Sequence, residues 1–263
     1  MKTVTSKDGT LIAYEKVGKG PALILVDGAL CYTKFGPMPD LAPLLADHFT
    51  VYYYDRRGRG DSGNVLPYAT DREIEDLEAV LEAAGGEAYL FGASSGGIIA
   101  LETANTVEGI KKVAVYEAPM IIDDTHAPMP EDYITNTQLH IINGRPGEAV
   151  KMFMKMVGMP RFAMFIMGFT PAWKKLVAVG HTLPHDLAFV EPFQQGKPLP
   201  KNLWKHVTMP TLVLDGGKSP EYMRNGQHML SQTLPHASYR TMKGQTHNIP
   251  PAILAPALIE FLS

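Results

Sequence analysis

The sequence predicts an α/β fold with a mostly parallel central sheet, helices on both faces and a helical cap insertion. Short apolar segments alternate with amphipathic ones over most of the 263 residues, which is typical of parallel strands joined by helices. The alternation stops between about Met120 and Met209, where helical patterns continue without a convincing strand. We therefore expect a single domain over residues 1–263, with a cap at about 120–209.

The strands are predicted mainly from short apolar runs. Ala22-Leu23-Ile24-Leu25-Val26 is the clearest, because a continuous run of this length fits a strand buried on both faces of a sheet. In chain order, the predicted strands span residues 10–15, 22–26, 50–54, 88–91, 113–116, 211–214 and 238–242.

The helices outside the cap are predicted from periodicity and stop signals. In the clearest, residues 70–84, Ile74, Leu77 and Leu81 recur at helical spacing. Thr70 with Glu73 is a plausible capping box, and Gly85-Gly86 follows as a stop. The predicted helices span residues 39–47, 70–84, 97–103, 222–234 and 252–262.

A candidate nucleophile lies between a predicted strand and a predicted helix. Gly92-Ala93-Ser94-Ser95-Gly96-Gly97 contains G-x-S-x-G in the strand–turn–helix setting that gives this motif its meaning. The glycines permit a tight turn that presents a serine hydroxyl at the carboxyl edge of the sheet. Ser95 is a rival nucleophile, but only Ser94 has glycine two places away on both sides.

With this motif, the chain resembles the α/β-hydrolase superfamily over nearly its whole length. The segment Asp55–Ser62 is similar to a loop that these proteins carry before the nucleophile, and Asp27-Gly28-Ala29 stands where they usually carry a His-Gly pair. The resemblance implies an oxyanion hole formed by the backbone N–H groups of Ala29 and Ser95. Asp in place of His at position 27 leaves that backbone function intact.

His247 is the candidate general base. It lies in a Gly244-Gln245-Thr246-His247 loop after the last predicted strand, which is where the superfamily places its base, and it follows the serine in chain order. Imidazole can accept and return the serine proton near neutral pH. The remaining histidines are expected on the surface or in the cap, and no H-x-x-x-H or H-E-x-x-H pattern indicates a metal site.

The acid that orients the base is predicted at Glu117, with alternatives. The usual superfamily position, in the loop after the strand at 211–214, holds Ser219 here, which cannot serve. The context of Tyr116-Glu117-Ala118-Pro119 is similar to the fungal zearalenone lactonases, whose acid is a Glu after the preceding strand. Asp215, Asp123 and Asp124 remain alternatives.

The composition and the apolar pattern of the sequence indicate the cellular compartment and the classes of binding partner to expect. A net charge of -3 without a Lys/Arg block argues against a nucleic-acid partner, and a lone cysteine, Cys31, cannot form an internal disulfide. The first residues lack the apolar stretch of a signal peptide, and no run approaches the ~20 apolar residues of a membrane span. We therefore expect a cytoplasmic enzyme with no membrane partner; the sequence does not predict the oligomeric state.

These observations predict a serine hydrolase that cleaves an ester or lactone through an acyl-enzyme on Ser94, without cofactor or metal. The region 120–209 holds nine of the 14 Met residues; these either form the core of the cap or line an adaptable apolar pocket, so a small, largely apolar substrate is expected. Hydrolysis of a C–C bond and cofactor-free perhydrolysis are alternatives within the fold. A hydrolase-fold ligand receptor or sensor with little turnover is the alternative from another class.

Overall fold

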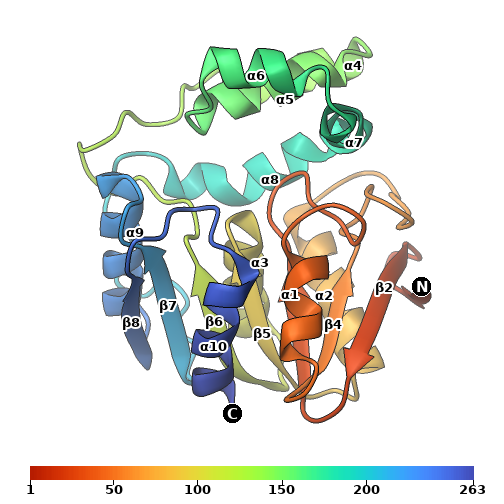
Figure 1. Cartoon of the computed structure of the whole chain (residues 1–263), viewed down its shortest axis with the longest axis vertical. Helices are drawn as coiled ribbons and strands as arrows, with labels where there is room; N and C mark the ends of the chain where they lie inside the picture. Colours follow the sequence, from red (N-terminus) through yellow and green to blue (C-terminus); the bar gives the residue numbers. More distant parts are fainter.

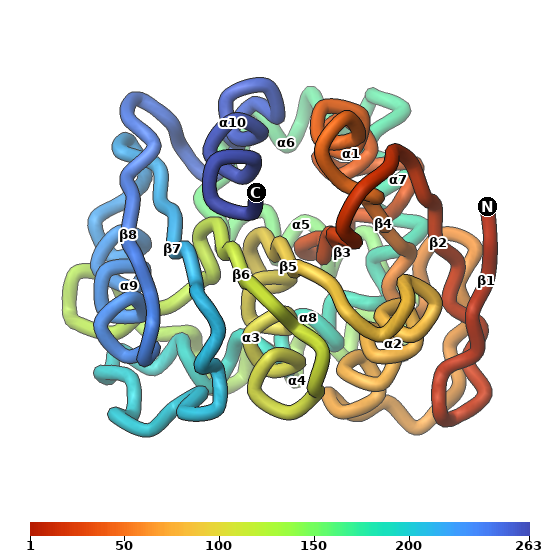
Figure 2. The backbone as a smooth tube through the Cα atoms, turned by 90° about the horizontal axis from the view of Figure 1, so that it is seen from below, coloured from red at the N-terminus to blue at the C-terminus, as the bar shows by residue number.

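An eight-stranded sheet forms the centre of the computed structural model, which describes residues 1–263. The strand order is β1-β2-β4-β3-β5-β6-β7-β8 (Figure 2). The first two strand pairs, β1 with β2 and β2 with β4, are antiparallel, and all others are parallel. The strands are β1 (Lys2–Thr5), β2 (Leu11–Gly18), β3 (Ala22–Val26), β4 (Thr50–Tyr54), β5 (Ala88–Ala93), β6 (Ile110–Tyr116), β7 (Thr211–Gly216) and β8 (Ala237–Met242). The predicted mostly parallel sheet is confirmed.

Helices cover both faces of this sheet, as predicted. Side chains alternate across β3: Ile24 and Val26 join the core on the side of α2 and α3, whereas Leu23 and Leu25 join the core on the side of α1 and α10. Figure 2 shows these two helix layers on opposite sides of the strands. The helices outside the cap are α1 (Met38–Leu45), α2 (Thr70–Ala83), α3 (Ser95–Thr106), α9 (Glu221–Thr233) and α10 (Pro251–Leu262).

The chain between β6 and β7 forms the helical insertion, a layer at one end of the sheet (Figure 1). Its small core joins Leu30 of the sheet domain to residues such as Val150 and Leu183. The insertion contains α4 (Tyr133–Ile142), α5 (Pro146–Met156), α6 (Arg161–Met167), α7 (Pro171–Val179), α8 (Leu183–Val190) and the short 3₁₀ turns η1 (Gly180–Thr182) and η2 (Glu191–Phe193). No single helix is long and apolar enough to cross a membrane; one pair, Arg161–Met167 with Pro171–Phe193, meets that test only jointly, across a 97° bend.

Three local expectations differ from the structure. Strand β1 was not expected, because its four residues are mostly exposed and carry no apolar run. Helix α3 begins at Ser95, two residues earlier than expected. The capping box at Thr70 and Glu73 is wrong: Ala69 is the N-cap and no side chain caps the helix. The Glu73 carboxylate instead accepts a hydrogen bond from Arg56 Nε at 2.6 Å, so a buried ion pair replaces the local cap.

Candidate active site

Ser94 occupies the sharp turn between β5 and α3. Its backbone has φ 54° and ψ −132°, a left-handed conformation that non-glycine residues adopt only where the surroundings enforce it. Its N–H donates to Tyr116 O at 2.9 Å, and its carbonyl accepts from Gly97 N–H at 2.8 Å. The Ser94 hydroxyl makes no hydrogen bond in the structure and is partly exposed. The turn therefore fixes the backbone of Ser94, while its hydroxyl is hydrogen-bonded neither to His247 nor to any other group.

Two glycines allow the close packing that forces this turn. A Cβ at Gly96 would lie 2.3 Å from the carbonyl oxygen of Val26 at the end of β3. A Cβ at Gly92 would lie 2.4 Å from the carbonyl oxygen of Gly96. Both contacts are with backbone, which cannot swing aside, so glycine is required at both positions. The start of α3 consequently lies directly against the carboxyl end of β3.

Glu117 and His247 are brought together from different parts of the chain. The Glu117 Oε2 atom lies 2.8 Å from Nδ1 of His247, and Oε1 accepts a hydrogen bond from the N–H of Gly216 at 2.7 Å. Glu117 is fully buried and has a left-handed φ of 47°. The neighbouring Tyr116 hydroxyl donates to the carbonyl of Thr246 at 2.6 Å. Residues 116 and 117 thus fix both the imidazole and the loop that carries it.

The three alternative acids do not contact the imidazole. Asp215 is buried, but its Oδ2 accepts a hydrogen bond from the hydroxyl of Tyr239 at 2.6 Å. Asp123 accepts hydrogen bonds from Thr125 and Asn225, and Asp124 is exposed on the surface. Among the candidate acids, the geometry therefore favours Glu117.

The expected oxyanion loop runs beside the serine. A Cβ at Gly28 would meet Ser94 Cβ at 3.0 Å and Oγ at 3.6 Å, so this backbone passes close to the candidate nucleophile. The N–H groups of Ala29 and Ser95 donate no hydrogen bond within the protein, as is usual for the first N–H of a helix such as that of Ser95. Two backbone donors near Ser94 are thus available to a ligand.

Asp27, which precedes this loop, is a buried carboxyl with few partners. Its Oδ1 accepts the N–H of Gly28 at 3.0 Å, whereas Oδ2 has no hydrogen-bond partner. Burial raises its pKa to about 7, against the opposing effects of the Gly28 hydrogen bond and the charge of Arg59. Around neutral pH the side chain is therefore close to half protonated.

A buried cluster of charges connects the insertion to the turn at Ser94. The carboxylate of Asp186, on α8, pairs with both Arg56 and Arg59 and accepts a hydrogen bond from Ser95 Oγ at 2.8 Å. Arg56 also forms a two-pronged pair with Glu73, at 2.6 and 2.8 Å. The two guanidinium charges hold the pKa of the Asp186 carboxyl below its usual value.

The same cluster orients the loop that carries Ala29. Arg59 Nη1 donates to the carbonyl oxygens of Gly28, at 2.8 Å, and Cys31, at 3.2 Å. The Gly28 carbonyl and the Ala29 N–H belong to one rigid peptide plane, so this hydrogen bond also sets the direction of the N–H. Asp186 therefore touches one of the two backbone donor residues directly and the other through Arg59.

Sequence reasoning missed the roles of Arg56, Arg59 and Asp186. The segment Asp55–Ser62 has three arginines in eight residues, and this density is a signal from which a charge cluster could be predicted. Nothing in the sequence points to Asp186, which lies 130 residues from Arg56. His185 lies in the cap, one of the two places expected for it, where it is buried and stacks on Tyr68 with ring centroids 3.8 Å apart. No group of three or more His, Cys, Asp or Glu side chains is placed to hold a metal ion.

Residues 25–257 match the model of the alpha/beta hydrolase family, and the chain belongs to this family. It is similar to an alpha/beta hydrolase from Sphaerobacter thermophilus, with 44% identity and a TM-score of 0.92 over 100% of both chains. Similar folds at lower identity include the enol-lactonase from Burkholderia xenovorans (17%, TM-score 0.73, 99% of each chain). Another is a thermophilic esterase from Thermogutta terrifontis (20%, TM-score 0.70, 99% of this chain and 97% of that chain).

The buried charge cluster predicts a large effect of removing Asp186. Asp186→Ala leaves Arg59 without its carboxylate and Arg56 with only Glu73, so the free energy of unfolding should fall by about 3–5 kcal/mol. Urea denaturation measures this. Asp61→Ala is the matched control, because Asp61 pairs with Lys34 on the surface and its loss should cost less than about 1 kcal/mol. Equal losses in the two variants would contradict the structural role of the cluster.

The raised pKa of Asp27 predicts a pH-dependent effect of Asp27→Asn. Between pH ~4 and about 7 the Asp27 carboxyl holds its proton in the folded protein but loses it in the unfolded chain. The free energy of unfolding of the wild type therefore falls as the pH rises through this window. Asparagine has no such proton. The stability of the variant relative to the wild type should therefore increase by about 2–3 kcal/mol from pH 5 to pH 8, measured by urea denaturation. A stability difference between Asp27→Asn and the wild type that does not change with pH would refute the raised pKa of Asp27.

Proposed function

We propose that the chain is a serine hydrolase that cleaves a carboxylic ester or lactone of a small, largely apolar substrate. The observation that carries the proposal is the 2.8 Å contact between Glu117 Oε2 and Nδ1 of His247. A carboxylate on Nδ1 selects the tautomer in which Nε2 is free to accept a proton. Ser94, in its left-handed turn, supplies the hydroxyl that gives up that proton.

In the first half of the reaction, Ser94 attacks the substrate carbonyl while His247 takes its proton. The buried Glu117 carboxylate stabilises the imidazolium that results. The negative oxygen of the tetrahedral intermediate is held by the N–H groups of Ala29 and Ser95, the latter reinforced by the positive end of the α3 dipole. His247 then donates its proton to the leaving alcohol oxygen, and an acyl-enzyme remains on Ser94.

In the second half, water replaces the alcohol. His247 accepts a proton from the water, the hydroxide attacks the acyl carbon, and the same two N–H groups hold the oxyanion. Collapse of the intermediate returns the proton to Ser94 and releases the carboxylic acid. With a lactone, alcohol and acid remain in one product, so the same residues perform a ring opening.

Two observations are consistent with an ester or lactone as the substrate. The esterase and the enol-lactonase named above share this fold, which makes the chemistry plausible for the scaffold. The insertion is rich in apolar side chains, including nine of the 14 methionines. A neutral, apolar acyl or alcohol group suits such surroundings.

Hydrolysis of p-nitrophenyl esters of increasing acyl length, together with small lactones, tests the proposal. The wild type should turn over repeatedly, and Ser94→Ala should lower kcat by about 10⁴-fold or more while remaining folded, because the nucleophile is lost. Ser231→Ala, at an α9 serine whose hydroxyl bonds only to the carbonyl of His228, is the matched control and should keep the wild-type turnover. Full activity in Ser94→Ala would refute the proposal, and absence of turnover in the folded wild type would favour a ligand sensor.

The acid assignment predicts a contrast between two isosteric variants. Glu117→Gln should lower kcat by about 10³-fold or more, because the amide neither stabilises the imidazolium nor selects the correct tautomer. Asp215→Asn should leave kcat within a few fold, since Asp215 bonds to Tyr239 and not to His247. Steady-state kinetics with one ester, and circular dichroism to check folding, decide between them. A large loss only in Asp215→Asn would reverse the assignment.

A further inference from the structure

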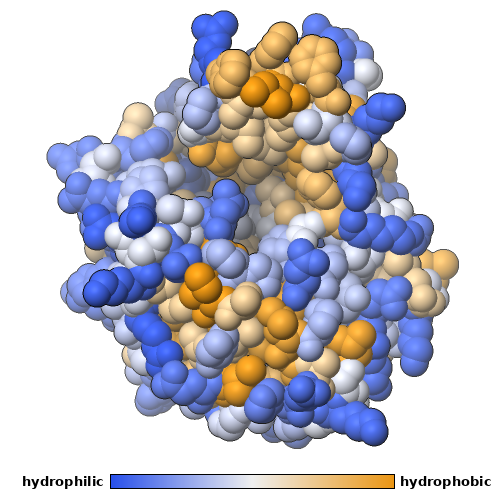
Figure 3. Space-filling view, viewed as in Figure 1, coloured by the Kyte–Doolittle hydropathy of each residue, from blue (hydrophilic) through white to orange (hydrophobic).

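The outer face of the insertion exposes a cluster of aromatic side chains. Phe162, Phe165, Ile166 and Phe169 are 75%, 66%, 49% and 79% exposed, and no residue of α6 is buried. Their spacing of i, i+3, i+4 and i+7 places them on one side of α6 and the turn that follows it. Figure 3 shows the apolar patch over α6, flanked by hydrophilic side chains. A contiguous exposed apolar patch of this kind marks an interaction surface.

The surroundings of this patch are basic, although the protein is acidic. Between Tyr133 and Thr182 the chain has six Lys or Arg and a single acidic residue, Glu148, whereas the whole chain carries a net charge of -3. Positive charge is thus concentrated in this segment of the insertion, which includes the exposed phenylalanines.

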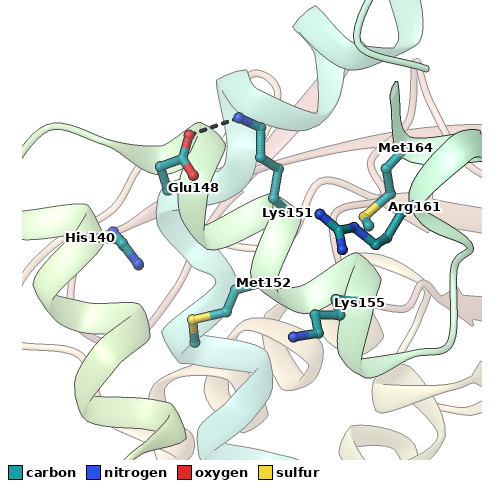
Figure 4. Close-up of a pocket in the computed structure, with 7 residues that line it drawn as sticks. All are labelled: His140, Glu148, Lys151, Met152, Lys155, Arg161 and Met164. Atoms are coloured by element: carbon teal, nitrogen blue, oxygen red, sulfur yellow. Dashed lines mark hydrogen bonds and ion pairs between the residues drawn. The ribbon is translucent and has the colours of Figure 1, made fainter. Parts of the chain in front are cut away.

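A cavity of about 410 Å³ lies beside the aromatic cluster and carries part of this charge (Figure 4). Lys151, Lys155 and Arg161 surround it, and Met152 and Met164 supply its apolar lining. Glu148 pairs with Lys151 at 2.8 Å. Lys155 and Arg161 form no ion pair in the structure, so their charges are available to an external anion.

We propose that this face docks on the surface of an anionic lipid bilayer. The docking face consists of the apolar side chains Phe162, Phe165, Ile166 and Phe169 and the cations Lys151, Lys155 and Arg161. The apolar side chains enter the boundary between headgroups and acyl chains, and the cations contact lipid phosphates. This proposal departs from the expectation, drawn from the sequence, of no membrane partner; it involves no membrane span, so it does not require a single long apolar helix.

The charge pattern favours a bilayer over a second copy of the chain. In a twofold dimer the same patch would meet itself, and the unpaired Lys155 and Arg161 would face their own counterparts without acidic residues to offset them. An anionic surface compensates these charges in a single contact. The phenylalanines are largely exposed and project outward, which suits a fluid layer better than a fixed complementary groove. This inference does not depend on the proposed catalytic function.

Co-sedimentation of the full-length protein with lipid vesicles tests the docking. The wild type should bind vesicles of phosphatidylcholine mixed with phosphatidylglycerol, and bind more weakly to pure phosphatidylcholine or at high salt. Lys155→Glu with Arg161→Glu should lower the partition coefficient by more than about tenfold. Phe162→Ser with Phe169→Ser should lower it by at least about tenfold as well.

Matched controls change charge or apolar surface elsewhere. Lys2→Glu with Lys19→Glu alters two exposed lysines outside the insertion, and Leu11→Ser with Leu66→Ser alters two exposed leucines. Both should bind like the wild type. Thermal unfolding checks that all four double variants fold.

Three results would overturn the proposal. The first is no binding of the folded wild type to vesicles that contain phosphatidylglycerol. The second is equal binding by docking-face variants and controls. The third is a dimer, detected by light scattering, that Phe162→Ser with Phe169→Ser dissolves while vesicle binding is absent; the face would then be a contact between copies of the chain.

Discussion

The carboxylate of Asp186 is the interaction on which the geometry of the site depends. It lies between Arg56 and Arg59, with Ser95 bonded to the same group, and every partner is almost fully buried. Burying these charges is favourable only because each has an opposite charge or a hydrogen bond, and the arrangement admits little displacement. Three separate parts of the chain, the loop after β4, the start of α3 and the insertion, are thereby held at one point. The placement of the backbone donors therefore depends on this distant constraint as well as on the glycines beside Ser94.

The second constraint is backbone strain at two neighbouring strand ends. Ser94 and Glu117 both have positive φ, and the N–H of Ser94 donates to the carbonyl of Tyr116, the residue before Glu117. Glu117 N–H in turn donates to Leu214 O at 3.0 Å. Each strained residue is thus anchored by the next strand of the sheet, which is how a conformation that is unfavourable in isolation persists. The parallel sheet positions the serine and the glutamate side by side because β5 and β6 pair directly.

The sequence predicted the fold and part of the site, for reasons that differ from residue to residue. Apolar runs and turn glycines determine the structure of their own short segments. The strand–turn–helix around Ser94 and the mostly parallel sheet could therefore be predicted from the sequence. The contact of Glu117 with His247 was expected from the resemblance and not from a sequence pattern around Glu117. A glutamate at the end of a strand has the same local sequence pattern whether or not it contacts a histidine. The pairing of Asp186 with Arg56 links positions 130 residues apart with no periodicity to reveal it. The predicted capping role of Glu73 was wrong for the same reason: its carboxylate pairs with Arg56, which is distant in the sequence, and does not cap α2.

The division of packing within the insertion has a consequence for its motion. Helix α8 is tied to the sheet domain through Asp186, and its Leu187 and Phe189 belong to the main core. Helix α6, in contrast, buries no side chain. Local opening requires the least energy where few apolar contacts are lost. The insertion therefore does not open as one rigid unit: α8 is held to the sheet domain, whereas local opening of α6 requires less free energy and leaves the donors beside Ser94 undisturbed.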